Sequence, residues 1–252
     1  MAELRRLLPR AEGGPRRTLP FGLPAIDACL PDGGLPRGAL HEIVPDRPGA
    51  TPAAFGFIAA VLSHLPRPHP VVLVLPTYGL RDYGRPYGHG LRALGLDPAG
   101  LIVVETAHRR DTLWAMEEAL HAGAPAAVAG FIDKLDLRLS QRLQLAAVDA
   151  GLPLFVLRPA ALSGAGRGAW GEASAAATRW RVAPAKAARD RFGLMARARW
   201  HLLLERCRNG RNGEWMVEYD HVAHRFSLAA ALADPAFSRG AGERPAARAG
   251  RA

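Results

Sequence analysis

The chain has 252 residues, of which 49% are hydrophobic, so it can bury the core of one large domain. It contains no apolar run of the roughly 18 residues that cross a bilayer, and its basic N-terminus lacks the apolar core of a signal peptide. We therefore expect a cytoplasmic protein without membrane contact. The net charge is +10, and the two cysteines, Cys29 and Cys207, give no disulfide framework and no zinc pattern.

The most informative stretch is residues 20–51. Glycine- and proline-rich residues lead into Ala39–Val44, an apolar run of strand length. Thr51 then suits an N-cap, and Pro52 suits the first position of a helix. Apolar side chains continue at helical spacing through Phe55, Ile58, Ala59, Leu62 and Leu65. The order of strand, loop and helix is typical of a nucleotide-binding βα unit.

The loop in this unit lacks the residues with which a phosphate-binding loop works. Such a loop reads G-x-x-x-x-G-K-[ST], in which glycines free backbone N–H groups, lysine neutralises phosphate and Ser/Thr holds Mg²⁺. Val44 stands at the first glycine position and Ala50 at the lysine position, so only the second glycine and Thr51 fit. Prolines also remove amide donors, and Arg47 lies on the wrong side of Gly49. The degenerate nucleotide loop comprises Pro45, Asp46, Arg47, Pro48, Gly49, Ala50 and Thr51.

Backbone N–H groups at the start of the helix allow weak nucleotide or anion binding near Thr51, and we expect no other cofactor.

A resemblance to the opening of the RecA core lies in the run Gly22-Leu23-Pro24-Ala25-Ile26-Asp27, Gly33-Gly34-Leu35-Pro36-Arg37-Gly38 and Glu42-Ile43. Over residues 18–230 the chain resembles the ImuA family, RecA-like proteins of bacterial mutagenesis cassettes. The resemblance implies an α/β fold, a RecA-like core with a mostly parallel central sheet flanked by helices and an antiparallel hairpin extension at the C-terminal end. In RecA-like proteins an N-terminal helix packs on the neighbouring subunit. The arm here, residues 1–19, is short and proline-ended, so we do not expect it to support a filament.

Further strands and helices alternate with short links, which predicts a parallel sheet with right-handed crossovers. Pro70–Pro76 is a continuous apolar run, typical of a strand that is covered on both faces. We expect more strands at Leu101–Val104, Ala126–Ile132 and Leu152–Leu157, helices at Leu91–Leu96, Asp111–His121 and Leu137–Ala150, and a loop at Tyr78–Gly90.

Two further features of an ATPase are missing at the positions that the resemblance assigns to them. The strand that faces the phosphate loop should end in an acid that holds Mg²⁺, but Gly130 stands there and Asp133 lies beyond the strand. The catalytic glutamate would fall near Thr77 and Tyr78, and neither is a base. With Ala50 these make three independent failures, so we expect no enzymatic activity and assign no catalytic residue.

Residues 159–178 form a loop of small residues whose length and composition predict mobility. The matching loop of RecA grips single-stranded DNA, and Arg167 with Trp170 offers charge and stacking for this contact. The alternative is an insert whose tryptophan docks on its own domain.

Residues 179–211 hold ten basic side chains against Asp190 and Glu205, which gives +8 of the total +10. So localised a charge favours a polyanion partner. Within the basic strands and hairpin of residues 179–220, the candidate DNA-binding residues are Arg179, Arg181, Arg197, Arg199, Arg206, Arg208 and Arg211.

A hairpin turn at 209–213 joins two predicted strands, Ala198–Arg206 and Glu214–Asp220. On the first strand, alternation puts Arg197 and Arg199 on one face and Arg206 and Arg208 on the opposite face. We favour a phosphate-tracking surface for single-stranded DNA. The alternative is a solvated edge hairpin, because arginine also discourages edge-to-edge aggregation.

The last residues, 231–252, have almost no large apolar group besides Phe237, so the domain spans 20–230 and the tail is expected to be disordered. The tail is either a solvated end or a partner-docking peptide. His221 and His224 are three apart in what we predict to be a strand, which places them on opposite faces, and we expect no metal site.

The resemblance implies membership of a DNA-damage-induced translesion synthesis complex at the nucleoid, with an ImuB-type adaptor and an error-prone C-family DNA polymerase as partners. The favoured function is a non-catalytic accessory protein that scaffolds these partners on DNA. One alternative is a divergent DNA-dependent ATPase of recombinase type. The other is a damage-induced inhibitor of cell division that acts by protein contact, for which the basic hairpin is only a solubility surface.

Overall fold

The computed structural model describes residues 18–65, 69–160, 173–187 and 197–229. Its main sheet has a parallel part and an antiparallel part. The parallel strands are β3 (Ala39–Pro45), β4 (Val71–Pro76), β5 (Leu101–Thr106), β6 (Ala127–Phe131), β7 (Pro153–Leu157) and β8 (Thr178–Pro184). The antiparallel strands are β9 (Ala198–Cys207), β10 (Gly213–Asp220) and β11 (Arg225–Leu228).

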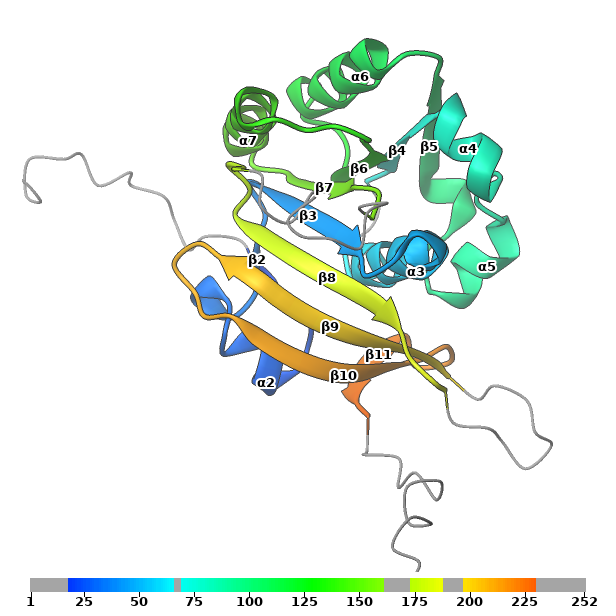
Figure 1. The fold of residues 1–252 in the computed structure, drawn as a ribbon, viewed down its shortest axis with the longest axis vertical. Coiled ribbons are helices and arrows are strands. Elements are labelled where there is room, and N and C mark those ends of the chain that lie inside the picture. The colour runs from blue at the N-terminus through cyan, green and yellow to red at the C-terminus, as the bar shows by residue number, and fades with distance from the viewer. Residues whose placement is uncertain (1–17, 66–68, 161–172, 188–196, 230–252) are drawn as a thin grey trace, which may run out of the picture.

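The strand order is β11-β10-β9-β8-β3-β7-β6-β4-β5, so β3 and β8 join the two parts (Figure 1). Every residue of β3 is buried. This architecture confirms the predicted α/β fold, in which a mostly parallel sheet continues into an antiparallel hairpin extension, and it agrees with a RecA-like core.

Helices cover both faces of the parallel part of the sheet. Helices α3 (Thr51–Leu62), α4 (Thr77–Tyr83) and α5 (Gly88–Ala93) lie on one side, and α6 (Arg109–His121) and α7 (Leu137–Ala150) on the other (Figure 1). The N-terminal segment, with β1 (Thr18–Leu19), α2 (Pro24–Asp27) and β2 (Leu35–Pro36), adds to the core on the α3 side. None of the helices in the described parts of the chain is long and apolar enough to span a membrane.

Two hydrophobic cores follow from this layering. The α3 side holds an aromatic cluster in which Phe57 lies 6.2 Å from Trp180 and 6.1 Å from Trp200, measured between ring centroids. The α6–α7 side is aliphatic and includes Met116 and Leu143. The sheet separates the two cores, because successive residues of a strand point to opposite faces.

Local signals fix several element boundaries. Helix α7 has the predicted bounds because Asp136 caps it by accepting a hydrogen bond from the Leu139 amide at 2.8 Å, and Gly151 ends it in the left-handed conformation. Helix α3 begins one residue earlier than predicted. Thr51 is its first residue, and Ala50, which has no capping side chain, occupies the N-cap.

Three predictions of local structure are wrong. Tyr78–Gly90 is not a loop, since α4 and the start of α5 occupy it and Gly84, with a φ of 75°, separates them. Helix α5 starts at Gly88 and not at Leu91 as predicted. Leu91 is its one buried residue and packs against the core in the middle of the helix. His221 and His224 lie in the turn after β10 and not in a strand.

The predicted alternation along β9 is also wrong at its end. The pairing of β8 with β9 shifts between Arg179 and Trp180, so that Trp180 faces Leu204 but Arg179 faces Arg206. Paired residues point to the same side of a sheet, and this β-bulge therefore turns Arg206 toward the face of Arg179.

A buried histidine joins the N-terminal segment to the sheet. His41 Nε2 lies 2.9 Å from the carbonyl oxygen of Pro36, and Nδ1 lies 2.8 Å from Thr178 Oγ1. A carbonyl only accepts, so Nε2 carries the proton and Nδ1 accepts from the hydroxyl. Both polar atoms of the neutral ring are satisfied, and complete burial lowers the pKa of His41 to about 4.

We expect the free energy of unfolding to fall by up to about 3 kcal/mol as the pH drops from 6.5 to about 4. The folded state holds His41 neutral while the unfolded chain protonates it, so this stability is complete above pH 6.5 and is lost on acidification. Urea unfolding across this range measures the slope. His41→Gln should reduce the slope, although His64, whose pKa burial also lowers, keeps part of it. Exposed His121→Gln should leave it unchanged, and a flat wild-type profile contradicts the assignment.

Candidate functional site

The degenerate nucleotide loop is closed, in the sense that most of its polar groups bond to one another or to neighbouring parts of the protein. It contains a 3₁₀ turn, Pro48–Ala50, in which the Ala50 amide donates to the carbonyl oxygen of Arg47 at 3.0 Å. The Asp46 amide donates to the carbonyl oxygen of Val182 in β8 at 3.1 Å. Ala50 is fully buried, and the prolines at 45, 48 and 52 have no amide hydrogen. Few backbone donors of this loop are therefore left for a phosphate.

The polar side chains of the loop contact the protein itself. Arg47 Nη1 forms an ion pair with Asp46 Oδ2 at 2.7 Å, so an adjacent carboxylate neutralises the only cation in the loop. Thr51 Oγ1, the position that holds Mg²⁺ in a working loop, lies 3.2 Å from the Pro48 carbonyl oxygen and 3.1 Å from the Tyr83 hydroxyl.

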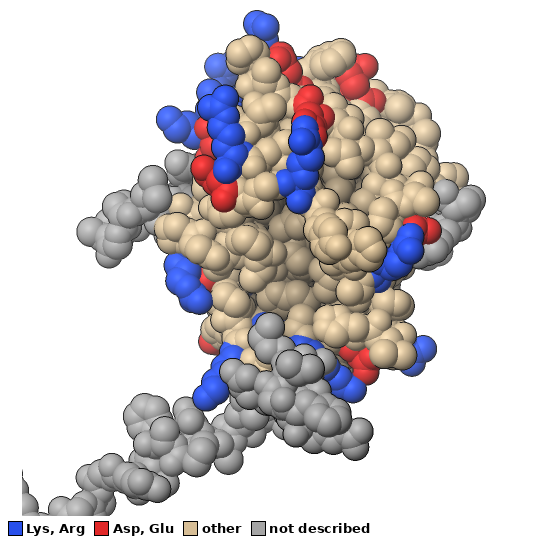
Figure 2. Space-filling model, turned by 90° about the vertical axis from the view of Figure 1, so that its right-hand side faces the viewer, with Lys and Arg blue, Asp and Glu red and all other residues tan. Residues whose placement is uncertain are grey.

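An apolar hollow of about 420 Å³ lies beside this loop, between α3, α4 and α5. Figure 2 shows the side of the molecule that contains it, with mostly uncharged residues around the depression. Side chains from three helices and from the ends of β6 and β7 line it, among them Phe55, Leu80, Tyr83, Leu91, Phe131 and Leu157. This hollow was not expected from the sequence, because a loop was predicted where α4 lies. The apolar residues Leu80 and Leu91 were the available signal.

The position assigned to the Mg²⁺-binding acid has no room for a side chain. Gly130 lies within β6 between Val74 of β4 and Val156 of β7. A Cβ atom there would overlap the Met116 Cε and lie 2.6 Å from the Val74 carbonyl oxygen. Residue 130 thus faces α6, away from the nucleotide loop. Its neighbour Phe131 lines the apolar hollow.

Two other residues considered for an ATPase site, Tyr78 and Asp133, are hydrogen-bonded to each other. Tyr78, in the first turn of α4, donates a hydrogen bond from its hydroxyl to Asp133 Oδ1 at 3.3 Å. Burial and the nearby carboxylate raise the pKa of Tyr78 to about 12, so it remains protonated at neutral pH. Asp133 Oδ1 also accepts from the Lys134 amide at 2.8 Å.

Four of the ten basic side chains in residues 179–211 pair with acids that are distant in the sequence. Arg197 Nη2 pairs with Asp220 Oδ2 at 2.7 Å, and Arg199 Nε donates to Glu218 Oε1 at 2.9 Å. Arg181 pairs with Glu205. These contacts place both charges of each pair on the same sheet, so the net charge of +8 in the linear segment overstates the charge on this surface.

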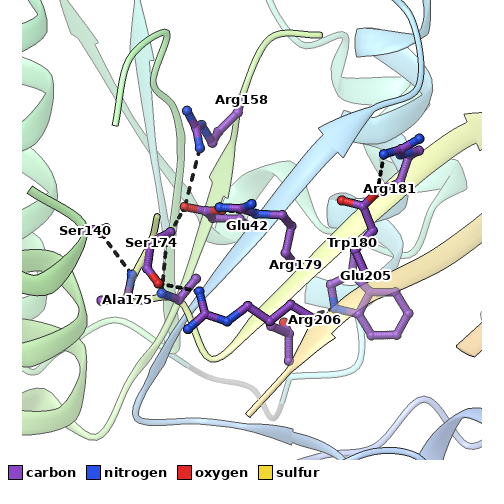
Figure 3. Close-up of polar contacts among 12 residues, drawn as sticks. Glu42, Ser140, Arg158, Ser174, Ala175, Arg179, Trp180, Arg181, Glu205 and Arg206 are labelled. Carbon is purple, nitrogen blue, oxygen red and sulfur yellow. Dashed lines mark hydrogen bonds and ion pairs between the residues drawn. The ribbon is translucent and has the colours of Figure 1, made fainter. Parts of the chain in front are cut away.

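Arg179 belongs to a buried charge network (Figure 3). Its Nε donates to Glu42 Oε2 at 2.7 Å, and Arg158 Nη1 lies 3.8 Å from Glu42 Oε1. Ser174 Oγ donates to the same Oε1 at 2.6 Å. The two guanidinium groups and the carboxylate are almost completely buried. Arg179 is thus a structural residue, out of reach of a polyanion.

The described end of the predicted mobile loop is anchored by this network. Besides the Ser174 contact, the Ala175 amide donates to Ser140 Oγ of α7 at 3.0 Å, and the Ala177 amide donates to the Leu40 carbonyl oxygen at 2.8 Å. Strand β8 starts at Thr178. Arg167 and Trp170 lie outside the described residues, and their DNA contact stays a prediction.

Three candidate arginines stay exposed at the end of the β9–β10 hairpin. Arg208 Nη2 donates to the Ala175 carbonyl oxygen at 2.8 Å, and Arg211 Nη2 to the Ala28 carbonyl oxygen at 3.1 Å. Arg206 donates to the Ser174 carbonyl oxygen. Carbonyl oxygens carry no full charge, so Arg206, Arg208 and Arg211 keep a positive surface at this corner. No group of His, Cys, Asp or Glu side chains within the described residues could hold a metal ion.

Gly130→Ala should destabilise the protein by about 1–3 kcal/mol, since the added methyl group overlaps Met116 and approaches the backbone of β4. Denaturant unfolding measures the change. Gly100→Ala is the matched control, because a Cβ atom at position 100 meets nothing within 4 Å. Equal stability of the two variants would show that β6 and Met116 make room for a Cβ atom at residue 130, contrary to the close contacts.

Glu42→Gln should cost about 3–5 kcal/mol, because it leaves two buried guanidinium groups without a negative charge. The exposed Glu214, which pairs with His201, provides the control variant Glu214→Gln with little expected change. Urea midpoints at neutral pH compare the two. A Glu42→Gln variant as stable as the control would mean that the network does not hold the junction together.

Comparison with known proteins supports the family expected from the sequence. No family model matches the chain. Protein ImuA of Caulobacter vibrioides, strain NA1000 / CB15N, is 37% identical over 233 residues, which cover 87% of this chain and 92% of the relative. Protein ImuA of strain ATCC 19089 / CIP 103742 / CB 15 gives the same values. With this identity over nearly the full length of both proteins, the chain belongs to the ImuA family.

Proposed function

We propose that the chain is a non-catalytic accessory protein of DNA-damage-induced, error-prone translesion synthesis. In this proposal it acts in the cytoplasm at the nucleoid, where it holds an ImuB-type adaptor and an error-prone C-family polymerase on DNA. The family supports the process, and the closed nucleotide loop beside an apolar hollow supports the mode of action.

The closed loop argues against ATP turnover on electrostatic grounds. A triphosphate needs cations and backbone donors around it. Here the lysine position is the buried Ala50, Arg47 is paired with Asp46, and Phe131, not a carboxylate, lines the hollow beside Thr51. The remaining amides near Thr51 support no more than weak binding of a nucleotide or another anion.

Within the described residues, the proposed DNA contact is confined to one corner of the molecule. Arg206, Arg208 and Arg211 are exposed and bound only to carbonyl oxygens in the described structure, which leaves their charge available to phosphates. Phosphate contacts of this kind bind without sequence preference and weaken with salt. Single-stranded DNA is the proposed ligand, with Arg167 and Trp170 as further contacts.

The test uses immobilised single-stranded DNA, a purified ImuB-type adaptor and this chain, with and without ATP. We expect retention of the adaptor to require the chain, to ignore ATP and to fall steeply with salt. The triple variant Arg206→Glu, Arg208→Glu and Arg211→Glu should reduce retention about tenfold or more. The control reverses three exposed arginines elsewhere, Arg81, Arg92 and Arg225, so that the net charge changes equally.

The other outcomes contradict the proposed scaffold. Retention that requires ATP supports the recombinase-type ATPase and contradicts the closed loop. If the adaptor binds DNA equally well without the chain, the chain does not act as a scaffold between them.

A second candidate function is favoured by the paired charges. Arg179, Arg181, Arg197 and Arg199 all contact carboxylates, which suits a damage-induced regulator that acts by protein contact alone, such as a cell-division inhibitor. In that case the triple variant keeps full activity in cells and the chain retains nothing on DNA.

A further inference from the structure

Helices α6 and α7 lie side by side on the sheet face opposite the apolar hollow (Figure 1). Both helices carry large apolar side chains that are exposed. The exposed fraction is 61% for Trp114, 62% for Leu145 and 51% for Val148. A cluster of large apolar groups on the surface is a common mark of a protein-binding site, and tryptophan is prominent among residues that dominate interfaces.

A groove runs between the two helices. It consists of two hollows of about 660 and 510 Å³, which share Arg142. One wall is a stripe of α6 spaced by four, three and four residues, and the other wall is a stripe of α7 with the same spacing. These stripes are Arg110, Trp114, Glu117 and His121 on α6, and Arg138, Arg142, Leu145 and Asp149 on α7. Eleven residues of helix span about 16 Å, so the groove is three turns long.

The floor of the groove is fixed by an ion pair. Glu117 is buried, and its Oε2 accepts from Arg142 Nη2 at 2.5 Å. This pair bridges the helices, while Met116 and Leu143 hold them to the sheet from below. The groove is therefore a preformed surface that needs no rearrangement to receive a ligand.

The charges of the groove are unevenly distributed. Arg109, Arg110 and Arg138 lie in the first turns of the two helices, where Asp111, 3.8 Å from Arg110, and the N-cap residue Asp136 of α7 oppose them, so the three cations keep a small excess at this end. The N-terminal partial charge of α6 adds to this positive end. At the other end the groove carries Asp149.

We propose that the α6–α7 groove binds an amphipathic helix of a partner protein. The apolar side chains of that helix contact Trp114 and Leu145, and its carboxylates lie over Arg109, Arg110 and Arg138. A groove between two parallel helices admits the ridge of a third helix, and apolar contacts along it recur at helical spacing. The inference does not depend on the proposed function, since it involves neither the nucleotide loop nor the basic hairpin.

Charge separates this ligand from two others. The terminal segments outside the described structure are net basic, with five arginines against two glutamates in residues 1–17 and four arginines against Asp234 and Glu243 in residues 230–252, so they do not complement the positive end. DNA is disfavoured because the carboxylates of Glu117 and Asp149 and the aliphatic Leu145 line one of the two hollows of the groove.

The test measures fluorescence anisotropy with labelled 18-residue helical peptides. Three acidic amphipathic peptides differ only in the anchor residue, which is Leu, Phe or Trp, and a basic twin of each replaces every Glu by Lys. We expect at least one acidic peptide to bind with a dissociation constant of about 1–100 μM and its basic twin to bind at least about tenfold more weakly.

The variants locate the binding. Leu145→Glu and Arg110→Glu should each weaken the acidic peptide by about tenfold or more. Val222→Glu changes an equally apolar side chain, 93% exposed in the turn after β10, and should have no effect. All substituted side chains are exposed, so circular dichroism should show an unchanged fold.

Four outcomes overturn the proposal: none of the acidic peptides binds below about 1 mM, Leu145→Glu binds like the wild type, the basic twins bind equally well, or a labelled single-stranded oligonucleotide and not the peptides loses its binding in Leu145→Glu. A fifth is a concentration-dependent dimer that Leu145→Glu turns into a monomer, because the groove would then bind a second copy of this chain.

Discussion

The carboxylate of Glu42 lies where the two parts of the sheet meet. It is buried in the middle of β3, and it contacts Arg179 of β8, Arg158 after β7 and Ser174 in the segment that leads into β8. A charge removed from water must be paired with good geometry, or it destabilises the fold by several kcal/mol. This requirement fixes the position of β8 against β3, and through β8 the position of every antiparallel strand beyond it.

The same junction explains how the nucleotide-binding frame survives without its chemistry. Strand β3 still leads through a loop into α3, as in a phosphate-binding unit. The Asp46 amide, however, bonds to β8, and the loop folds into a 3₁₀ turn over the buried Ala50. On β6, which β7 separates from β3, Phe131 and not an acid lines the hollow beside the loop. The pocket beside the loop is lined mainly by apolar side chains, which supports the proposal that the chain does not turn over ATP.

Three surfaces of the molecule are therefore spatially separate. The apolar hollow lies among α3, α4 and α5, the groove lies between α6 and α7 on the opposite face of the sheet, and Arg206, Arg208 and Arg211 lie at the end of the β9–β10 hairpin. A protein that joins several partners needs surfaces that do not compete. This arrangement supports a scaffold better than it supports an enzyme, whose groups converge on one site.

The sequence by itself determined most of the elements and their order, because apolar runs, N-caps and glycine stops act within a few residues. Strand β4 and helix α7, with Asp136 and Gly151 at its ends, are examples. The degenerate loop was visible for the same reason. Only the tertiary structure decided which charges remain available and where apolar surface is left. Arg199 meets Glu218 across a hairpin and Arg179 meets Glu42 across the sheet, and a β-bulge reverses the side of Arg206. Such pairings join residues up to 137 positions apart, so no local pattern records them.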